Sequence, residues 1–293
     1  MRRFFQNPMA IVIFTLPALL VFSLMVYYPF VQIFYRSFFE WDGLTVSQFI
    51  GFDNYRRLME DDLFGTSIRN GLIFAFVLMF VQIGGASFLT FAMTSIRMRG
   101  MRFLRSVYFL PVVLSITVVS QLWNSILDPD HGMFNSFMAS LGFSFRQSWL
   151  SDTNSAIYVV ALSNAWQYMG YQFALLYAGI KAIPEHFFEA SLIDGCNKRQ
   201  IYFRITMPLL AETYKLCLVM SVTGGLNAFA NMMLMTGGGP GTSTYTLTFM
   251  MYRAAFRLNE FGYGCAVAVI LVIQCLAAIA IINRVVAREQ LTY

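Results

Sequence analysis

Residues 183–208 read IPEHFFEASLIDGCNKRQIYFRITMP and lie between two long apolar runs. Pro184 suits the first turn of a helix, where its missing N–H is not needed. Gly195 can adopt the left-handed conformation at which such a helix ends. Asn197 and Gln200 have the three-residue spacing of a capping box, which opens a second helix. The stretch therefore predicts two short helices joined by a turn.

The rest of the chain is dominated by apolar residues. Of 293 residues, 58% are hydrophobic and 12% are charged, whereas soluble domains carry roughly a quarter charged residues. A helix needs about 20 mostly apolar residues to cross a bilayer. Six stretches meet that test: 9–35, 70–96, 104–127, 155–180, 213–236 and 262–283. The sequence predicts an all-α membrane protein, a single domain over residues 1–293, with six transmembrane helices and a loop at 181–212.

The basic residues predict how the helices are oriented. The chain holds 20 Lys and Arg, and most of them lie in the N-terminus, the second and fourth loops and the tail. These are Arg2, Arg3, Arg97, Arg99, Arg102, Arg105, Lys181, Lys198, Arg199, Arg204, Lys215, Arg284 and Arg288. Because Lys and Arg accumulate on the cytoplasmic side, we expect both termini and the loop at 181–212 to be cytoplasmic.

Several classes of function fit the composition poorly. The net charge of +5 comes from residues scattered at the ends of apolar runs, not from a basic face, so we expect no nucleic-acid partner. His131 and His186 stand alone and the four cysteines show no paired spacing, so no metal site is expected. Carboxylates are confined to loops and helix ends, which disfavours a membrane enzyme.

Three short motifs in the quoted stretch resemble a known signature. Glu189–Ser191, Asp194–Cys196 and Ile205–Pro208 are similar to the Glu-Ala-Ala, Asp-Gly-Ala and Ile-Thr-Leu-Pro motifs of binding-protein-dependent ABC permeases. Further along, Thr236–Pro240 and Phe261–Tyr263 are similar to the sugar-permease branch of that family. The tail lacks a Gly-rich ending, so the chain resembles the first, maltose-type or glycerol-phosphate-type, subunit.

The resemblance implies a six-helix type I importer permease fold and a set of partners. It implies a second homologous permease subunit, two cytoplasmic ABC ATPase subunits, an extracytoplasmic sugar-binding protein and the lipid bilayer of a bacterial inner membrane. The first helix of the loop would be the coupling helix that docks on an ATPase. The implied docking positions are Glu185, Glu189, Ala190, Asp194 and Gly195. The alternative is an amphipathic loop that rests on the membrane surface.

No nucleotide site is expected on this chain. Residues 237–241 are rich in glycine but lack the Gly-Lys-Ser/Thr ending of a phosphate-binding loop, so we expect a tight turn there instead. ATP and Mg²⁺ would be bound by the partner ATPase. We therefore expect no catalytic residues, no cofactor and no metal on this chain.

Polar residues recur at helical spacing on the fourth and fifth predicted helices. They are Asn164, Tyr168 and Tyr171, flanked by Gln167 and Gln172, and then Thr223, Asn227 and Asn231. Amides and hydroxyls can donate and accept, and aromatic faces cover a sugar ring, so the mixture suits a neutral carbohydrate. The resemblance places substrate contacts near Asn164, Tyr168, Tyr171 and Asn227. The alternative is hydrogen bonding between helices.

Two other transporter classes remain open at this point. A glycerol-phosphate-type permease would be expected to place Arg or Lys near the midplane, and neither polar helix contains one there. A secondary transporter would usually have an intramembrane carboxylate or broken, repeated helices, and it would leave the signature motifs unexplained. A sugar permease is therefore the favoured interpretation.

Overall fold

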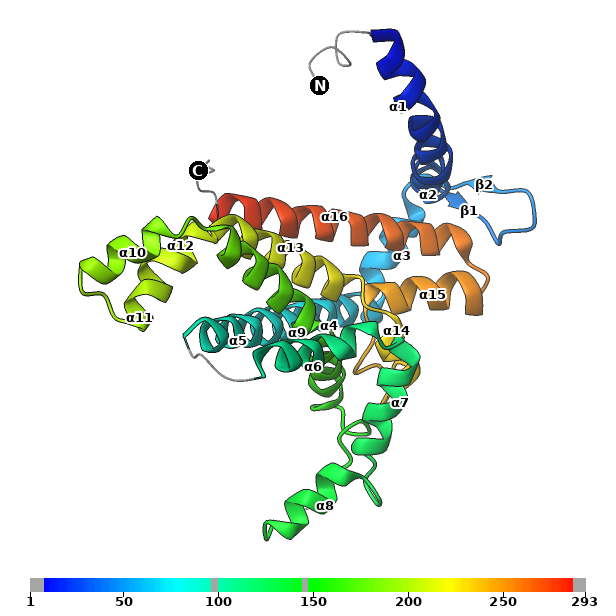
Figure 1. Ribbon diagram of the computed structural model, residues 1–293. Coiled ribbons are helices and arrows are strands. Elements are labelled where there is room, and N and C mark those ends of the chain that lie inside the picture. The colour runs from blue at the N-terminus through cyan, green and yellow to red at the C-terminus, as the bar shows by residue number, and fades with distance from the viewer. Residues whose placement is uncertain (1–7, 96–99, 144–146, 287–293) are drawn as a thin grey trace. The chain divides into compact units, whose positions relative to one another are not determined.

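The computed structural model describes residues 8–95, 100–143 and 147–286 (Figure 1). Of the basic residues that predict the orientation, Arg2, Arg3, Arg97, Arg99 and Arg288 lie outside these residues. The chain divides into two compact units, residues 1–61 with 250–270 and residues 62–249 with 271–293. Helices α15 (Leu247–Arg257) and α16 (Phe261–Val285) contribute to both units.

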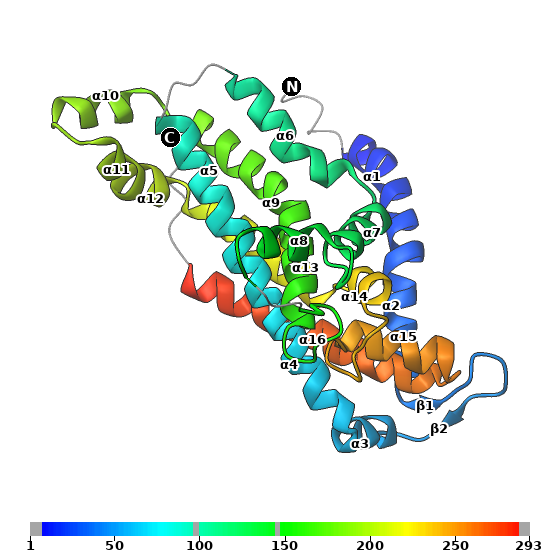
Figure 2. The ribbon, with the colours of Figure 1, turned by 90° about the horizontal axis from the view of Figure 1, so that it is seen from below.

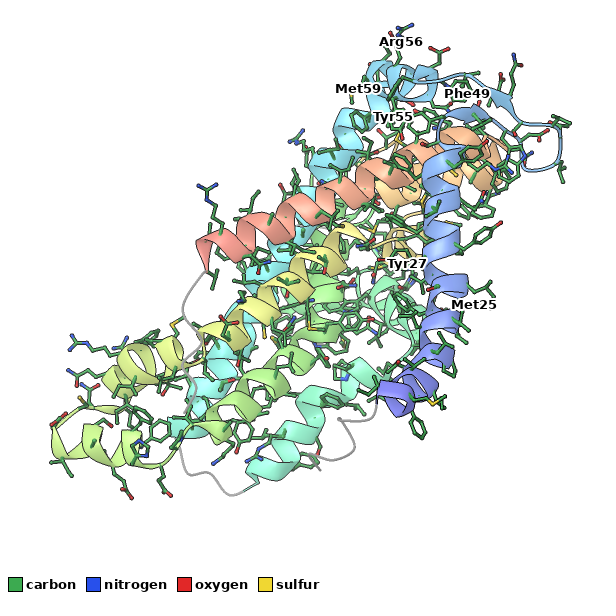
Figure 3. The ribbon with its side chains drawn as sticks, turned by 90° about the horizontal axis from the view of Figure 1, so that it is seen from above. Met25, Tyr27, Phe49, Tyr55, Arg56 and Met59 are labelled. Carbon is green, nitrogen blue, oxygen red and sulfur yellow. The ribbon has the colours of Figure 1, made fainter. Side chains whose placement is uncertain are left out.

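Unit 1 begins with one long helix followed by a small hairpin. Its elements are α1 (Pro8–Phe22), the π-helical turn η2 (Ser23–Tyr27), α2 (Tyr28–Arg36), β1 (Phe39–Glu40), β2 (Gln48–Phe49) and α3 (Asp53–Glu60). The most apolar 18-residue window of residues 11–36 has a mean hydropathy of 2.2, and none of that window is buried. Met25 and Tyr27 project from this helix (Figure 3) and are 66% and 62% exposed. Such a helix needs lipid or another subunit around it.

The hairpin and α3 are fixed by hydrogen bonds within unit 1. The strands are antiparallel, with Phe39 opposite Phe49. The Asn54 amide donates to the carbonyls of Ser37 at 2.9 Å and Phe39 at 3.0 Å. Gly262 lies so close to the Phe39 carbonyl that an added Cβ would overlap it. Figure 3 labels the exposed residues Phe49, Arg56 and Met59 of this region, and the half-buried Tyr55, whose hydroxyl lies 2.7 Å from that of Ser37.

Unit 2 is a helical bundle. Its elements are α4 (Asp62–Leu78), η3 (Met79–Ile83), α5 (Gly84–Ser95), α6 (Met101–Val113), α7 (Ile116–Ile126), α8 (Met133–Ser140), α9 (Ala156–Ala182), α10 (His186–Ile193), α11 (Lys198–Ile201), η4 (Tyr202–Thr206), α12 (Met207–Leu209), α13 (Ala211–Leu226) and α14 (Ala230–Met235). Helix α9 packs against α4, α5, α6 and α13, and Figure 2 shows it between α5 and α6. Because α9 touches each of these helices, it is the centre of the bundle.

Several helices are long and apolar enough to cross a membrane. Among the described residues these are 11–36, 62–94 and 261–285, and two bent pairs, 103–126 and 198–226, bring the total to as many as five. Helix α9, which the sequence predicts as a span over 155–180, is not among them. Its amide and hydroxyl side chains lower its hydropathy, although 13 of its residues are buried in the bundle.

Two predicted helices are broken in the structure. The stretch 104–127 is α6 and α7, which meet at an angle of 101°. Leu114 is extended there, and the Ser115 hydroxyl accepts a hydrogen bond from the Val118 N–H at 3.3 Å, which starts a new helix. Gln167 donates to the freed Leu114 carbonyl at 3.0 Å. This hydrogen bond from α9 replaces the helical one that the Leu114 carbonyl loses at the break.

The stretch 213–236 is broken in the same way. Helix α13 ends at Leu226 and α14 starts at Ala230. The Ala228 carbonyl between them accepts a hydrogen bond from the Thr248 hydroxyl at 2.7 Å. The helix predicted at 70–96 starts earlier than expected, since α4 begins at Asp62. The Asp62 carboxylate suits the first turn of a helix, because it interacts favourably with the helix dipole.

Candidate functional site

The loop at 181–212 folds as the quoted stretch predicts. Helix α10 spans His186–Ile193, with Glu185 as its N-cap residue, and Gly195 has φ +75°. The capping box is confirmed: the Asn197 side chain accepts from the Gln200 N–H at 3.0 Å, and the Gln200 side chain accepts from the Asn197 N–H at 2.8 Å. Gly195 and the capping box lie where the sequence predicts them, whereas Pro184 precedes the N-cap residue instead of lying in the first turn.

One face of α10 is open to solvent and the other packs on the bundle. All the predicted docking positions are exposed, namely Glu185, Glu189, Ala190, Asp194 and Gly195. Ile193 beside them is 86% exposed. On the other face Phe187 and Phe188 pack against the core cluster that contains Leu176, Tyr202 and Leu210. The exposed face is thus a mixed acidic and apolar surface whose opposite side packs on the core.

A cavity of about 620 Å³ lies within unit 2, and all the predicted substrate-path residues line it. They are Asn164, Tyr168 and Tyr171 on α9 and Asn227 at the end of α13. Tyr168 and Tyr171 are 36% and 37% exposed, so part of each side chain remains accessible. None of the described residues that line the cavity carries a formal charge.

Three hydrogen bonds define what we call the cavity network, formed by Gln82, Asn164, Gln172, Ser221 and Asn231. The Asn164 amide donates to the Asn231 side-chain oxygen at 2.8 Å. The Gln172 amide donates to the Ser221 hydroxyl at 2.9 Å, and Ser221 donates to the Gln82 side-chain oxygen at 2.8 Å. The network therefore joins η3, α9, α13 and α14 around the cavity.

Two buried atoms of the cavity network have no hydrogen-bond partner among the described residues. They are Oε1 of Gln172 and Nδ2 of Asn231. The two side chains are 3% and 1% exposed. Because an unpaired buried polar atom is costly, turning either amide toward the cavity would be favourable when a molecule there can pair with it.

The sequence missed two members of the cavity network, Gln82 and Ser221. Gln82 did carry a signal, since it is an amide in the middle of an apolar run and lies in a π-helical turn, a feature common at functional sites. The predicted stripe of Thr223, Asn227 and Asn231 on one helix is wrong, because the chain breaks after Leu226. Asn227 instead donates to the Thr223 carbonyl at 2.9 Å.

The glycine-rich segment after α14 is the tight turn that the sequence predicts. Gly237, Gly238 and Gly241 have φ values of +61°, +91° and +60°. The Thr236 and Thr244 hydroxyls are 2.7 Å apart across it. Asn70 of α4 donates to the carbonyls of Ser243 and Tyr245 at 2.9 Å each, which fixes the turn to the bundle.

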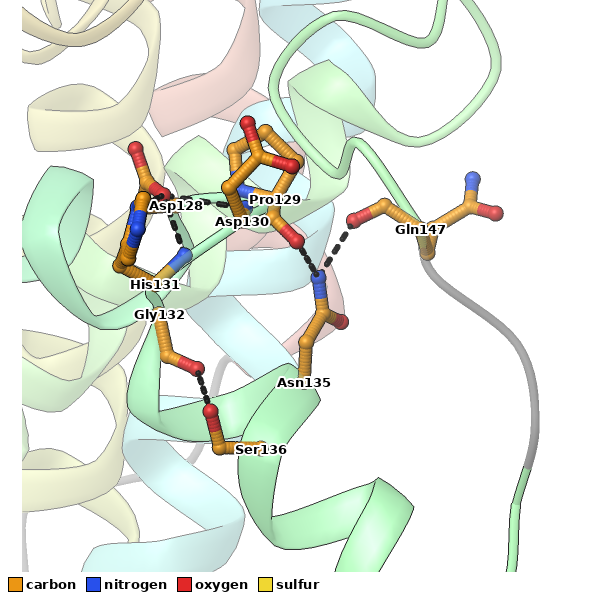
Figure 4. A network of polar contacts seen from close by, with 8 residues as sticks. All are labelled: Asp128, Pro129, Asp130, His131, Gly132, Asn135, Ser136 and Gln147. Carbon is orange, nitrogen blue, oxygen red and sulfur yellow. Dashed lines mark hydrogen bonds and ion pairs between the residues drawn. The ribbon is translucent and has the colours of Figure 1, made fainter.

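The loop between α7 and α9 is organised by its own polar network (Figure 4). The Asp128 carboxylate accepts from the N–H groups of His131 at 2.8 Å and Asp130 at 3.0 Å. These backbone hydrogen bonds lower the pKa of Asp128 below its ordinary value. Asn135 of α8 donates to the carbonyls of Pro129 at 3.2 Å and Gln147 at 3.1 Å. The two ends of the loop are thereby held together.

Comparison with known proteins was made at the level of sequence and of fold. No family model matches the chain. A probable ABC transporter permease of Pyrococcus horikoshii is 35% identical over 274 residues, which cover 92% of each chain. The multiple sugar-binding transport system permease MsmF of Streptococcus mutans is 31% identical over 249 residues, which cover 84% of each chain.

The fold is also that of a solved transporter. A chain of a bacterial alginate ABC transporter, crystallised with a periplasmic protein that carries an alginate pentasaccharide, has a TM-score of 0.85 at 21% identity. The match covers 98% of this chain and 97% of that one. From these sequence and fold relationships together, this multi-pass membrane chain belongs to the sugar-permease family of ABC transporters.

Proposed function

We propose that this chain passes a neutral sugar or oligosaccharide through the membrane as one permease subunit of an ABC importer. The observation that carries the proposal is the cavity, which is lined by amides, a serine hydroxyl, two tyrosine rings and apolar side chains and, among the described residues, by no charged side chain. A neutral polyol matches such a lining, since each hydroxyl both donates and accepts.

Recognition would use the free atoms of the cavity. Gln172 and Asn231 line the cavity, and each keeps one buried, unpaired amide atom. A turn of either amide toward the cavity would let the Gln172 oxygen accept a sugar hydroxyl proton or the Asn231 nitrogen donate to a sugar oxygen. Tyr168 and Tyr171 offer ring faces to the apolar face of a pyranose. Asn227, which is exposed, completes the proposed contacts.

The proposed partners follow from the resemblance to binding-protein-dependent ABC permeases. Two cytoplasmic ATPase subunits bind ATP and Mg²⁺ and hydrolyse the nucleotide, and one of them docks on the exposed face of α10. A second homologous permease completes the path, and an extracytoplasmic binding protein delivers the sugar. Lys181, Lys198, Arg199 and Arg204 around α10 favour a cytoplasmic loop and cytoplasmic termini in a bacterial inner membrane.

A glycerol-phosphate-type importer is the alternative within the same family. A phosphate would require cationic side chains near its oxygens, and none lines the cavity among the described residues. The second permease would then have to provide the positive charge. A secondary transporter is no longer an alternative, because the chain belongs to an ABC family.

The test is ATP hydrolysis by the assembled complex in nanodiscs. The chain is co-expressed with the transport genes beside it, and ATPase activity is measured with the binding protein and a panel of neutral sugars, glycerol phosphate and acidic oligosaccharides. Stimulation by a neutral sugar alone supports the proposal. Stimulation only by an anionic compound overturns the neutral class, and the absence of any co-purifying ATPase overturns the assembly.

Orientation has its own test. Green fluorescent protein fused after the last residue fluoresces only when it is cytoplasmic, whereas alkaline phosphatase is active only outside. Fluorescence without phosphatase activity is expected, and the reverse pattern would place the coupling loop on the wrong side.

A further inference from the structure

Three hydroxyl-bearing residues meet where the loop at 181–212 joins the bundle. Tyr202 donates to the Ser87 carbonyl at 2.9 Å. The Tyr202 and Tyr214 hydroxyl oxygens are 3.2 Å apart, and the Tyr214 oxygen is 3.0 Å from the Ser87 hydroxyl oxygen. We call this set, Ser87, Tyr202 and Tyr214, the hydroxyl ring.

The one carbonyl in the hydroxyl ring fixes the direction of every hydrogen bond. A carbonyl can only accept, so the single Tyr202 proton points to Ser87. Tyr202 must then accept from Tyr214, and Tyr214 must accept from the Ser87 hydroxyl. Each hydroxyl donates once, and the loss of one member leaves another without its partner.

The hydroxyl ring joins α5 to two elements that lie more than 100 residues later in the chain. Tyr202 lies on η4 in the loop, Ser87 on α5 and Tyr214 on α13. Tyr202 and Tyr214 are 5% and 9% exposed, within the cluster that contains Leu89, Leu176 and Cys217. In this apolar setting, water cannot readily replace a lost partner.

The same two bundle helices are joined again at the cavity. Ser221 of α13 donates to Gln82 of η3, the turn that continues directly into α5. Tyr214 and Ser221 are two turns apart on α13, which is roughly 10 Å at 1.5 Å per residue. The hydroxyl ring and the cavity network are therefore two cross-links on one pair of helices.

We propose that the hydroxyl ring is the positioning device that carries displacement of the coupling loop to the cavity. This inference rests on the proposed function, because it presumes that an ATPase moves α10. Hydrogen bonds weaken steeply with distance and angle, so the ring holds η4 to α5 and α13 in one defined arrangement. A shift of the loop then either moves both helices or opens the ring.

The decisive variant is Tyr202→Phe, which removes only the hydroxyl. It keeps the aromatic ring and its packing against Phe91, whose ring centroid lies 5.1 Å from that of Tyr202. The matched control is Tyr177→Phe, because Tyr177 packs against the same cluster and its hydroxyl has no hydrogen-bond partner within the part of the chain that the structure describes. Both variants are assayed as assembled complexes in proteoliposomes.

The readout is the number of ATP molecules hydrolysed per sugar imported, together with the thermal stability of the complex. Tyr202→Phe is expected to raise that number at least threefold with little change in stability, and Tyr177→Phe to leave it unchanged. A ratio in Tyr202→Phe equal to wild type overturns the inference. If wild type itself shows no sugar-stimulated hydrolysis, the proposed function fails instead.

A graded series keeps the inference testable if Tyr202→Phe does not assemble. Ser87→Ala removes only a hydroxyl and leaves the carbonyl that Tyr202 contacts, so its effect is expected to be smaller than that of Tyr214→Phe. The double variant Tyr202→Phe/Tyr214→Phe is expected to be no worse than Tyr202→Phe alone. Fully additive effects in the double variant would contradict a closed ring.

Discussion

The hydroxyl ring and the cavity network link the same helices, but they differ in how completely their polar atoms are paired. In the hydroxyl ring every hydroxyl proton has an acceptor. In the cavity network Gln172 and Asn231 each keep a buried atom without a partner among the described residues. A cluster whose hydrogen bonds are all made favours one fixed arrangement. A cluster with unpaired amide atoms can form additional hydrogen bonds to a ligand once those amides turn toward it.

This contrast separates two kinds of defect. Changes on the loop side should alter how much ATP is used per sugar, without altering the sugar concentration at half-maximal uptake. Changes on the cavity side should alter that concentration and leave the ATP cost of each sugar unaffected.

Gly195→Val should break the loop side most severely. Gly195 has φ +75°, and an added Cβ meets nothing within 4 Å, so the variant suffers from backbone strain alone, which costs roughly 1–2 kcal/mol. We expect import to fall more than tenfold with the complex still assembled. Gly142→Val is the matched control, since Gly142 has φ +88° in equally open space. Equal losses in both variants would argue against a special role for the loop.

Asn231→Leu should break the cavity side. The variant removes the free donor and leaves the Asn164 amide without its 2.8 Å acceptor. Losing one or two hydrogen bonds of about 1 kcal/mol each should raise the half-maximal sugar concentration about tenfold, since 1.4 kcal/mol is a factor of ten. The control is Asn124→Leu. Asn124 of α7 also donates to α14, at the Leu234 carbonyl, but does not line the cavity.

Ser221→Ala should have a smaller effect on the same side. Ser221 is the bridge between Gln172 and Gln82. Losing this hydrogen-bonded bridge should weaken sugar binding by about 1 kcal/mol, which corresponds to a roughly fivefold rise in the half-maximal sugar concentration. Ser163→Ala is the control, since Ser163 is also fully buried but lies outside the cavity lining. An unchanged concentration in Ser221→Ala would remove this serine from the recognition machinery.

The smallest expected effect lies in the loop of Figure 4, which belongs to neither side. The lowered pKa of Asp128 means that its turn is stabilised above the ordinary carboxyl pKa of 3.8 and loses this support as the pH falls below that value. Hydrogen-exchange protection at residues 128–132 should therefore be constant from about pH 7 to 5. In Asp128→Asn the protection should be weaker and independent of pH, and a pH-dependent loss there would point to another titrating group.

Features that depend on local sequence were predictable. Gly195 and the pair Asn197 and Gln200 set their own helix boundaries, and the structure places both as expected. The breaks after Leu114 and Leu226 were not predictable in this way. Each leaves a backbone carbonyl without its helical partner, and a distant side chain, Gln167 or Thr248, donates the hydrogen bond that replaces it.

The candidate site follows the same division. Polar residues on α9 could be found because Asn164, Tyr168 and Tyr171 recur at helical spacing within one apolar run. The members contributed by other elements, Gln82 and Ser221, are 139 residues apart, and a single sequence gives no indication that they meet. The hydroxyl ring was missed for the same reason. Whether the predicted docking and substrate residues perform those roles stays a prediction until the variants are assayed.

The first helix has a consequence for how the protein is made. None of its most apolar window is buried among the described residues. In the newly made protein this surface must therefore reach lipid before water-exposed apolar side chains drive aggregation. A copy in which the surface stays uncovered offers it to quality-control proteases, so whatever surrounds this helix also determines how long the protein survives in the cell.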